Sequence, residues 1–168
     1  MRHFTWKLSL VSLLVGLLVT SGQVGAAIQA DAKPKARLEF TLVATPEEKS
    51  VAIEVEDRNS PGKKILVLKQ AILDQSSIAS AEVIKAGSGN AVSLKMTKEG
   101  AALLKEATSR NVNRQMAIVF NGQVIFAPVI RDRIEGSVLI TGKDPGLSDK
   151  EAGAIVDAIQ SAKAPRNR

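Results

Sequence analysis

The chain contains no cysteine and no tyrosine, and its only histidine, His3, lies beside the N-terminus. The absence of cysteine excludes disulfide bonds, thiolate metal ligands and lipoprotein acylation. Nucleophilic catalysis needs a base beside the nucleophile, and no serine occupies a Gly-x-Ser-x-Gly turn. The sequence therefore predicts a protein that is not an enzyme and has no catalytic residue.

Aromatic residues are also scarce, with one Trp and four Phe. Phe4 and Trp6 belong to the N-terminal segment, so the folded part has only Phe40, Phe120 and Phe126. Aliphatic side chains must form the core, and an aromatic surface for stacking nucleic-acid bases is not expected. The net charge of +6 includes no long run of like charges, so it favours weak attraction to anionic surfaces and no nucleic-acid partner.

Two pairs of carboxylates stand close together in the sequence, Glu47 with Glu48 in a turn and Glu54 with Glu56 on one face of a strand. Such pairs can act as acid and base or hold a cation, but a solubilising surface is the commoner role and we favour it. Gly87-Ser-Gly89 precedes a strand, whereas a phosphate-binding loop needs a helix N-terminus after its glycines. Because no ligands are clustered, we expect neither a cofactor nor a metal site.

The N-terminal segment has the features of an export signal. Arg2 and Lys7 precede an apolar run, and small residues follow at Val24-Gly-Ala-Ala27, which predicts a signal peptide over residues 1–27. Residues 8–30 carry no charge, so an uncleaved membrane anchor is the alternative. Either form directs the rest of the chain to the periplasm or cell envelope. We expect residues 28–36 to be a linker, 37–163 the folded domain and 164–168 a basic tail.

Alternating apolar residues predict several strands in the first half of the domain. Residues 37–43 and 51–56 alternate cleanly, and we expect them to pair with each other as a hairpin. Further strands are predicted at 65–68, 78–86 and 92–97.

Two helices are predicted. Thr97 is a suitable N-cap for a helix that runs to about Asn111, and Gly100 in its first turn allows close packing. The second helix begins with the capping box Ser148-Asp-Lys-Glu151. Its apolar residues fall on one face; they are Ala152, Ile155, Val156 and Ile159.

A hairpin lies at the centre of the domain. Asn121-Gly122 separates the apolar runs 117–120 and 124–127, and both residues tolerate the positive φ of a type I′ turn. Because the two runs are apolar almost throughout, we expect these strands to be covered on both faces. With a further strand at 137–141, the elements predict an α+β fold with a mostly antiparallel sheet and two helices packed on one face.

A family resemblance is carried by the same region. Its residues, in order, are Ala91-Val-Ser-Leu94, Glu99-Gly-Ala101, Asn111-Val112, Ala117-Ile-Val119, Asn121-Gly122, Val124-Ile125, Ala127-Pro-Val-Ile130, Gly136 and Gly142. Over about residues 72–159 the pattern resembles the head subdomain of the first periplasmic domain of SecD, in the SecD/SecF protein-export family.

The resemblance implies a binding module in protein export. In SecD this subdomain faces outward above the translocon and handles the emerging chain. We therefore expect a non-catalytic extracytoplasmic module that contacts polypeptides or envelope proteins, with Sec translocon components among its expected partners. After Ala30 no apolar run is long enough to span a membrane, so the proton-driven motor activity of SecD is not expected of this chain.

Two surfaces are candidates for partner binding. Arg110, Arg114, Arg131 and Arg133 bracket the hairpin and form either one basic patch or four separately solvated side chains, the second being favoured. A basic patch would fit the alternative function, a free-standing envelope protein that binds an anionic ligand, a glycan or a membrane surface. An exposed sheet edge could instead accept an extended polypeptide by strand addition, but the sequence does not locate that edge.

Overall fold

The computed structural model describes residues 36–163. The predicted leader at 1–27, the linker up to residue 35 and the basic tail at 164–168 therefore lie outside the described residues. Among the helices of residues 36–163, none combines the length and the apolar character that a bilayer span requires.

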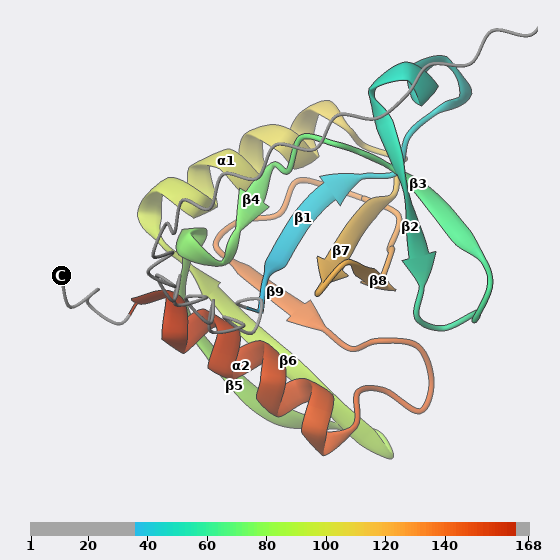
Figure 1. The fold of residues 1–168 in the computed structure, drawn as a ribbon. Helices are drawn as coiled ribbons and strands as arrows, with labels where there is room; N and C mark the ends of the chain where they lie inside the picture. The colour runs from blue at the N-terminus through green and yellow to red at the C-terminus, as the bar shows by residue number, and fades with distance from the viewer. Residues whose placement is uncertain (1–35, 164–168) are drawn as a thin grey trace, which may run out of the picture. The chain divides into compact units, whose positions relative to one another are not determined.

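The described residues have the predicted α+β fold, with two helices and two sheets (Figure 1). The larger sheet has the strand order β3-β2-β8-β7-β1-β4 and the smaller sheet has the order β5-β6-β9. The strands are β1 (Leu38–Leu42), β2 (Ala52–Asp57), β3 (Lys64–Leu68), β4 (Leu73–Asp74), β5 (Ile78–Ala86), β6 (Gly89–Met96), β7 (Met116–Phe120), β8 (Gln123–Phe126) and β9 (Ser137–Ile140). The helices are α1 (Lys98–Arg110) and α2 (Asp149–Lys163), with short 3-10 turns η1 (Pro46–Val51) and η2 (Gln75–Ser77).

The larger sheet curls until β3 meets the end of β1. Val43 bridges Val67, and the Ala44 N–H donates to the Leu66 carbonyl at 2.9 Å. The strands β1, β3, β2, β8 and β7 thus form a closed ring, in which residues 43 and 44 cover the outer edge of β3.

The predicted pairing of the first two strands is wrong. β1 pairs with β7 and β4, whereas β2 pairs with β3 in antiparallel and with β8 in parallel orientation. Alternation correctly identifies both segments as strands, but it gives no information on the partner. The η1 turn carries the chain across the ring, so β2 does not fold back on β1.

The central hairpin is β7–β8, and Asn121 and Gly122 connect its strands with φ values of 51° and 79°. Both faces of β7 are buried, as the unbroken apolar run predicts. Met116 and Ile118 belong to the main core between sheets and helices, whereas Ala117 and Val119 pack inside the ring. This strand therefore joins the two cores.

Both helix starts follow the predicted capping chemistry. The Thr97 hydroxyl accepts the Gly100 N–H at 2.9 Å at the start of α1. At the start of α2, the Ser148 N–H donates to Glu151 Oε2 at 3.0 Å, and the Glu151 N–H donates to Ser148 Oγ at 3.3 Å. In Figure 1, α2 lies across β5 and β6, where it buries Ile155 and Ile159.

Candidate functional site

An apolar groove of about 380 Å³ lies between the β7–β8 hairpin and β9. Ten of its fourteen lining residues are apolar: Phe40, Met116, Ile118, Phe126, Pro128, Val129, Ile130, Ile134, Val138 and Leu139. The other four are Arg131, Asp132, Arg133 and Ser137. Apolar clefts with a few polar groups are the usual form of a binding site.

The floor of the groove is a row of side chains from three neighbouring strands. Phe40 in β1 pairs with Ile118 in β7, which pairs with Phe126 in β8, so the three side chains lie on one face. Phe40 and Ile118 are buried, and Phe126 is half-buried at the end of the row. Phe126 is therefore the member of the row most available to a bound molecule.

One wall of the groove is the edge of β9, which within residues 36–163 pairs only with β6. The Met96 N–H donates to the Gly136 carbonyl at 2.8 Å. This bond identifies Gly136 as a residue whose backbone faces β6, and every second residue after it in β9 does the same. In an antiparallel pair alternate residues point toward the partner strand, so Leu139 directs its N–H and C=O away from β6. Outside that ladder, Leu139 makes no backbone hydrogen bond within residues 36–163.

The opposite wall is the segment 128–134, which is fixed at both ends. The Pro128 carbonyl accepts the Met116 N–H at 2.9 Å, and the Ile130 N–H donates to the Arg114 carbonyl at 2.8 Å. At the other end the Ile134 N–H donates to the Thr108 hydroxyl of α1 at 2.9 Å. These contacts hold the side chains of 131–133 at the rim of the groove.

The four arginines predicted to form a candidate surface occupy different environments. Arg131 and Arg133 line the groove, whereas Arg110 and Arg114 do not. Arg110 pairs with Glu106 one turn earlier on α1 at 2.8 Å. Arg114 is partly buried, and its guanidinium contacts the Glu48 carboxylate at 2.6 Å and the Val43 carbonyl at 3.2 Å. Arg114 therefore fastens η1 to the body of the domain.

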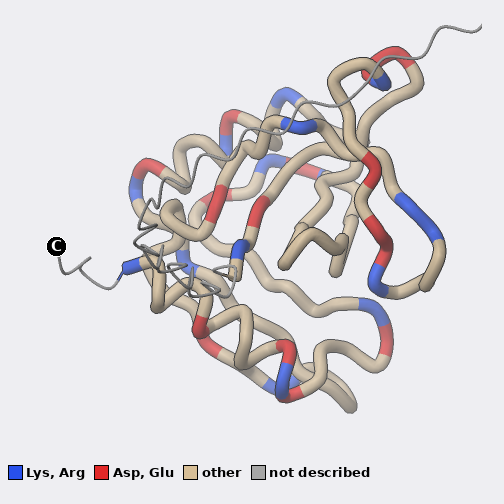
Figure 2. The backbone as a smooth tube through the Cα atoms, in the orientation of Figure 1, with Lys and Arg blue, Asp and Glu red and all other residues tan. Residues whose placement is uncertain are grey.

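One member of each predicted carboxylate pair forms an ion pair with a nearby cation. Glu48 binds Arg114, and Glu54 binds Lys64 across the β2–β3 ladder at 2.8 Å. The hydrogen bond from Lys64 holds the pKa of Glu54 below its usual value. No three His, Cys, Asp or Glu side chains of the described part gather as a metal site. In Figure 2 the basic and acidic segments are intermixed along the backbone.

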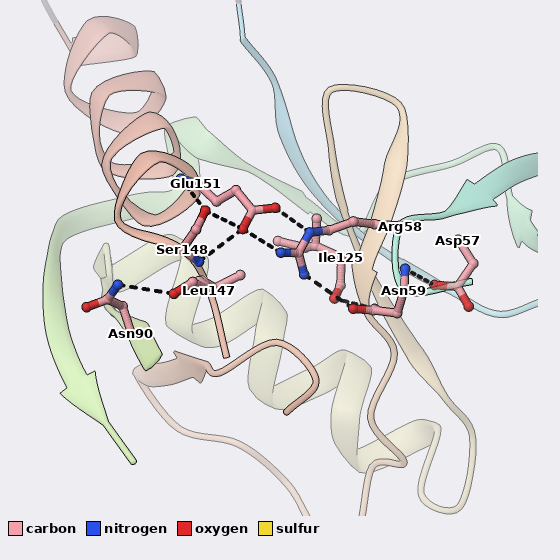
Figure 3. A network of polar contacts seen from close by, with 8 residues as sticks. All are labelled: Asp57, Arg58, Asn59, Asn90, Ile125, Leu147, Ser148 and Glu151. Carbon is pink, nitrogen blue, oxygen red and sulfur yellow. Dashed lines mark hydrogen bonds and ion pairs between the residues drawn. The ribbon is translucent and has the colours of Figure 1, made fainter. Parts of the chain in front are cut away.

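A polar network joins β8, the β2–β3 turn and α2 (Figure 3). The guanidinium of Arg58 makes two hydrogen bonds to the carboxylate of Glu151, and the Asn59 amide donates to the Ile125 carbonyl at 3.1 Å. Burial opposes ionisation of Glu151, but hydrogen bonds from Ser148 and Arg58 outweigh it and hold its pKa below the usual 4.5. The network fixes β8 directly beside Phe126.

Of the groove residues, only Arg131 and Arg133 were identified as candidates from the sequence. The apolar lining residues could not be distinguished from core residues in the sequence, because most of them also belong to the hydrophobic core. The sequence predicts a strand at 137–141, but it does not show that this strand lies at the edge of its sheet.

The family model of the SecDF P1 head subdomain matches residues 50–160. This match begins within η1, upstream of the region that carried the resemblance, and includes β2 and β3.

Curated relatives match part of their own length. SecD of Calditerrivibrio nitroreducens is 36% identical over 99 residues, covering 58% of this chain and 19% of the relative. SecD of Syntrophobacter fumaroxidans is 31% identical over 152 residues, covering 77% of this chain and 27% of the relative. The chain thus spans less than a third of the length of each of these SecD proteins.

A solved structure has the same fold. It is described as SecDF, a membrane component that enhances protein export, and it aligns with a TM-score of 0.57 and 27% identity, covering 76% of this chain and 63% of that chain. SecDF in a super-membrane-facing form aligns over 76% of this chain and 19% of that chain, with a TM-score of 0.55 and 28% identity. From the family match, the relatives and the shared fold, the chain belongs to the SecDF P1 head subdomain family.

Proposed function

We propose that this chain is a non-catalytic extracytoplasmic module that holds segments of unfolded polypeptide during protein export. The observation that carries the proposal is the apolar groove floored by Phe40, Ile118 and Phe126. A role in protein export is supported by the solved SecDF structure, which is described as a membrane component that enhances protein export and shares this domain.

An unfolded chain exposes apolar side chains that a folded protein has buried. Transfer of such a side chain into the groove gains about 25 cal/mol for each Å² removed from water. A groove of about 380 Å³ accommodates a few side chains at a time, so binding is weak and reversible. A module with these properties holds a moving polypeptide without trapping it.

The predicted leader supports a position outside the cytoplasm. A signal peptide at 1–27 or an anchor at 8–30 would deliver the domain to the periplasm or cell envelope, where secreted chains emerge. Sec translocon components are the proposed protein partners, because relatives that share this domain are described as protein translocase subunits.

The proposal is tested with the full chain and a fluorescently labelled, reduced and unfolded secreted polypeptide. We expect saturable binding by fluorescence anisotropy, with affinity lowered at least about tenfold by Phe126→Ser, equivalent to about 1.4 kcal/mol. Val129, which lines the same groove and is 37% exposed, offers a second variant, Val129→Ser, that perturbs the fold less.

The matched control is Leu103→Ser. Leu103 is an apolar residue of α1 that is 48% exposed and lies outside the groove, so its substitution should leave binding unchanged. Equal loss from all three variants would contradict the proposal. Salt-sensitive binding to anionic vesicles without binding to unfolded polypeptide would instead support the alternative function in which an anionic surface is the ligand.

A further inference from the structure

The groove also determines which polypeptide segments it accepts, an inference that rests on the proposed function. We propose that a bound segment adds to β9 as an extended strand, with apolar side chains at every second position and an acidic residue beside them.

The backbone of β9 supplies the first part of the argument. Leu139 directs its N–H and C=O into solvent beside the groove, and the residue is 48% exposed. The Ser137 N–H already donates to the Glu135 carbonyl at 2.9 Å, so the free stretch of the edge is short. An extended segment presents matching C=O and N–H groups, whereas a helix uses its own groups internally.

The other strand edges are less suited to strand addition. In the smaller sheet the opposite edge is β5, where the ammonium of Lys163 donates to the Ala79 carbonyl. In the larger sheet β3 meets Val43 of the chain, and the remaining edge strand β4 has only two residues. No residue of β3, β4 or β5 lines the apolar groove.

Strand geometry then sets the side-chain pattern. Successive residues of a strand point to opposite faces, so a segment paired with β9 turns every second side chain toward the apolar lining. Phe126 and Val138 contribute to that lining, while the intervening side chains of the segment face water. The groove therefore accepts a segment with alternating apolar and polar side chains, the pattern of a strand that will be half-buried once the secreted protein folds.

The rim adds a preference for negative charge. Arg131 is exposed and has no ion pair among residues 36–163. Arg133 contacts Glu135 at 3.3 Å, but that carboxylate is also bound by Lys105 at 2.8 Å. Asp132 is the acidic residue between them, and its carboxylate accepts the Arg133 N–H at 2.7 Å. The free cation at the rim is therefore Arg131, which attracts an acidic residue of the segment.

The test uses the full chain and the blocked hexapeptide Asp-Val-Thr-Val-Thr-Val, followed by versions that are N-methylated at one amide at a time. Methylation removes one donor and leaves the side chains unchanged. We expect loss of binding, at least about fivefold, at amides that face β9 and little loss at those between them, a period of two along the peptide. Uniform loss, or no loss, would overturn strand addition.

Two further experiments test the spacing of the apolar side chains and the preference for an acidic residue. A peptide of the same composition with its valines at helical spacing should bind at least about fivefold more weakly. Replacing the aspartate of the hexapeptide by lysine should weaken binding to the wild-type chain, and Arg131→Glu should reverse that preference. Arg110→Glu is the matched control, since Arg110 lies outside the groove, and it should leave the preference unchanged.

The two proposals fail in different ways. Absence of binding by both the hexapeptide and the unfolded secreted polypeptide overturns the proposed function together with this inference. Binding that ignores N-methylation and peptide pattern overturns this inference alone and leaves polypeptide capture by the apolar groove standing.

Discussion

Arg58 and Glu151 lie 93 positions apart in the chain, and their side chains meet in a two-pronged ion pair (Figure 3). Arg58 follows β2 in the ring, and Glu151 sits in the first turn of α2. The same carboxylate closes the capping box with Ser148. One acidic side chain thus both starts a helix and attaches it to the ring.

Alanine substitution of Glu151 should lower the free energy of unfolding more than alanine substitution of Arg58. We expect Arg58→Ala to lower the free energy of unfolding by about 1 to 2 kcal/mol, because the pair is bidentate and partly buried. Glu151→Ala should cost about 1 kcal/mol more, since it also removes the cap. Urea denaturation measures both values. Lys64→Ala is the control: its pair with Glu54 is well exposed and screened by solvent, so the substitution should leave the urea midpoint almost unchanged.

The contribution of Glu151 should depend on pH. Its pKa is held below 4.5 in the folded state, so the stabilisation is complete above that pH and is lost as the pH falls through the lower folded value. The difference in unfolding free energy between wild type and Glu151→Gln should therefore be constant near neutral pH and shrink progressively as the pH falls below 4.5. A difference that does not change on acidification would contradict a lowered pKa for Glu151 in the folded state.

Two helical glycines should respond in opposite directions to alanine. A Cβ on Gly100 would overlap the Ser77 carbonyl oxygen, so Gly100→Ala should force α1 away from η2 and cost about 1 to 3 kcal/mol. A Cβ on Gly153 in α2 would have no neighbour within 4 Å. Gly153→Ala should stabilise the protein by about 0.5 to 1 kcal/mol through helix propensity. Thermal unfolding compares them, and equal signs would refute the packing argument.

Two substitutions of Asn121 should separate the contribution of its backbone conformation from that of its side-chain hydrogen bond. Asn121 has a positive φ of 51°, and its side-chain oxygen accepts the Arg37 N–H at 3.0 Å. Asn121→Ala loses both features and should cost about 1 to 2 kcal/mol, whereas Asn121→Gly keeps the backbone freedom and should cost less. Urea denaturation of the two variants tests this, and equal losses would mean that φ at residue 121 carries no strain.

Local chemistry was readable from the sequence. The Asn121-Gly122 turn, the Thr97 N-cap and the Ser148-to-Glu151 capping box depend on residues a few positions apart, and the structure has all three. Strand pairing was less readable, because it depends on contacts between distant segments. Alternation over 37–43 identifies a strand, but it does not indicate that Thr41 on the polar face is buried, that β1 joins β7 or that β3 closes the ring.

The candidate site shows the same limit. Arg114 resembles any exposed arginine in the sequence, yet its guanidinium is committed to Glu48, 66 positions earlier. The groove depends on the phase of the β6–β9 ladder and on a row of side chains from three strands. Neither feature has a signature within a short stretch of sequence.

The ring of strands has a consequence for how the groove works. The strands that form its floor are hydrogen-bonded to neighbours on both sides, and β7 contributes side chains to both hydrophobic cores. A bound polypeptide therefore contacts a surface that is rigid before binding. Capture then requires little reorganisation of the receiver, and association should be quick, with the lifetime of the complex set by how fast the guest strand peels from β9.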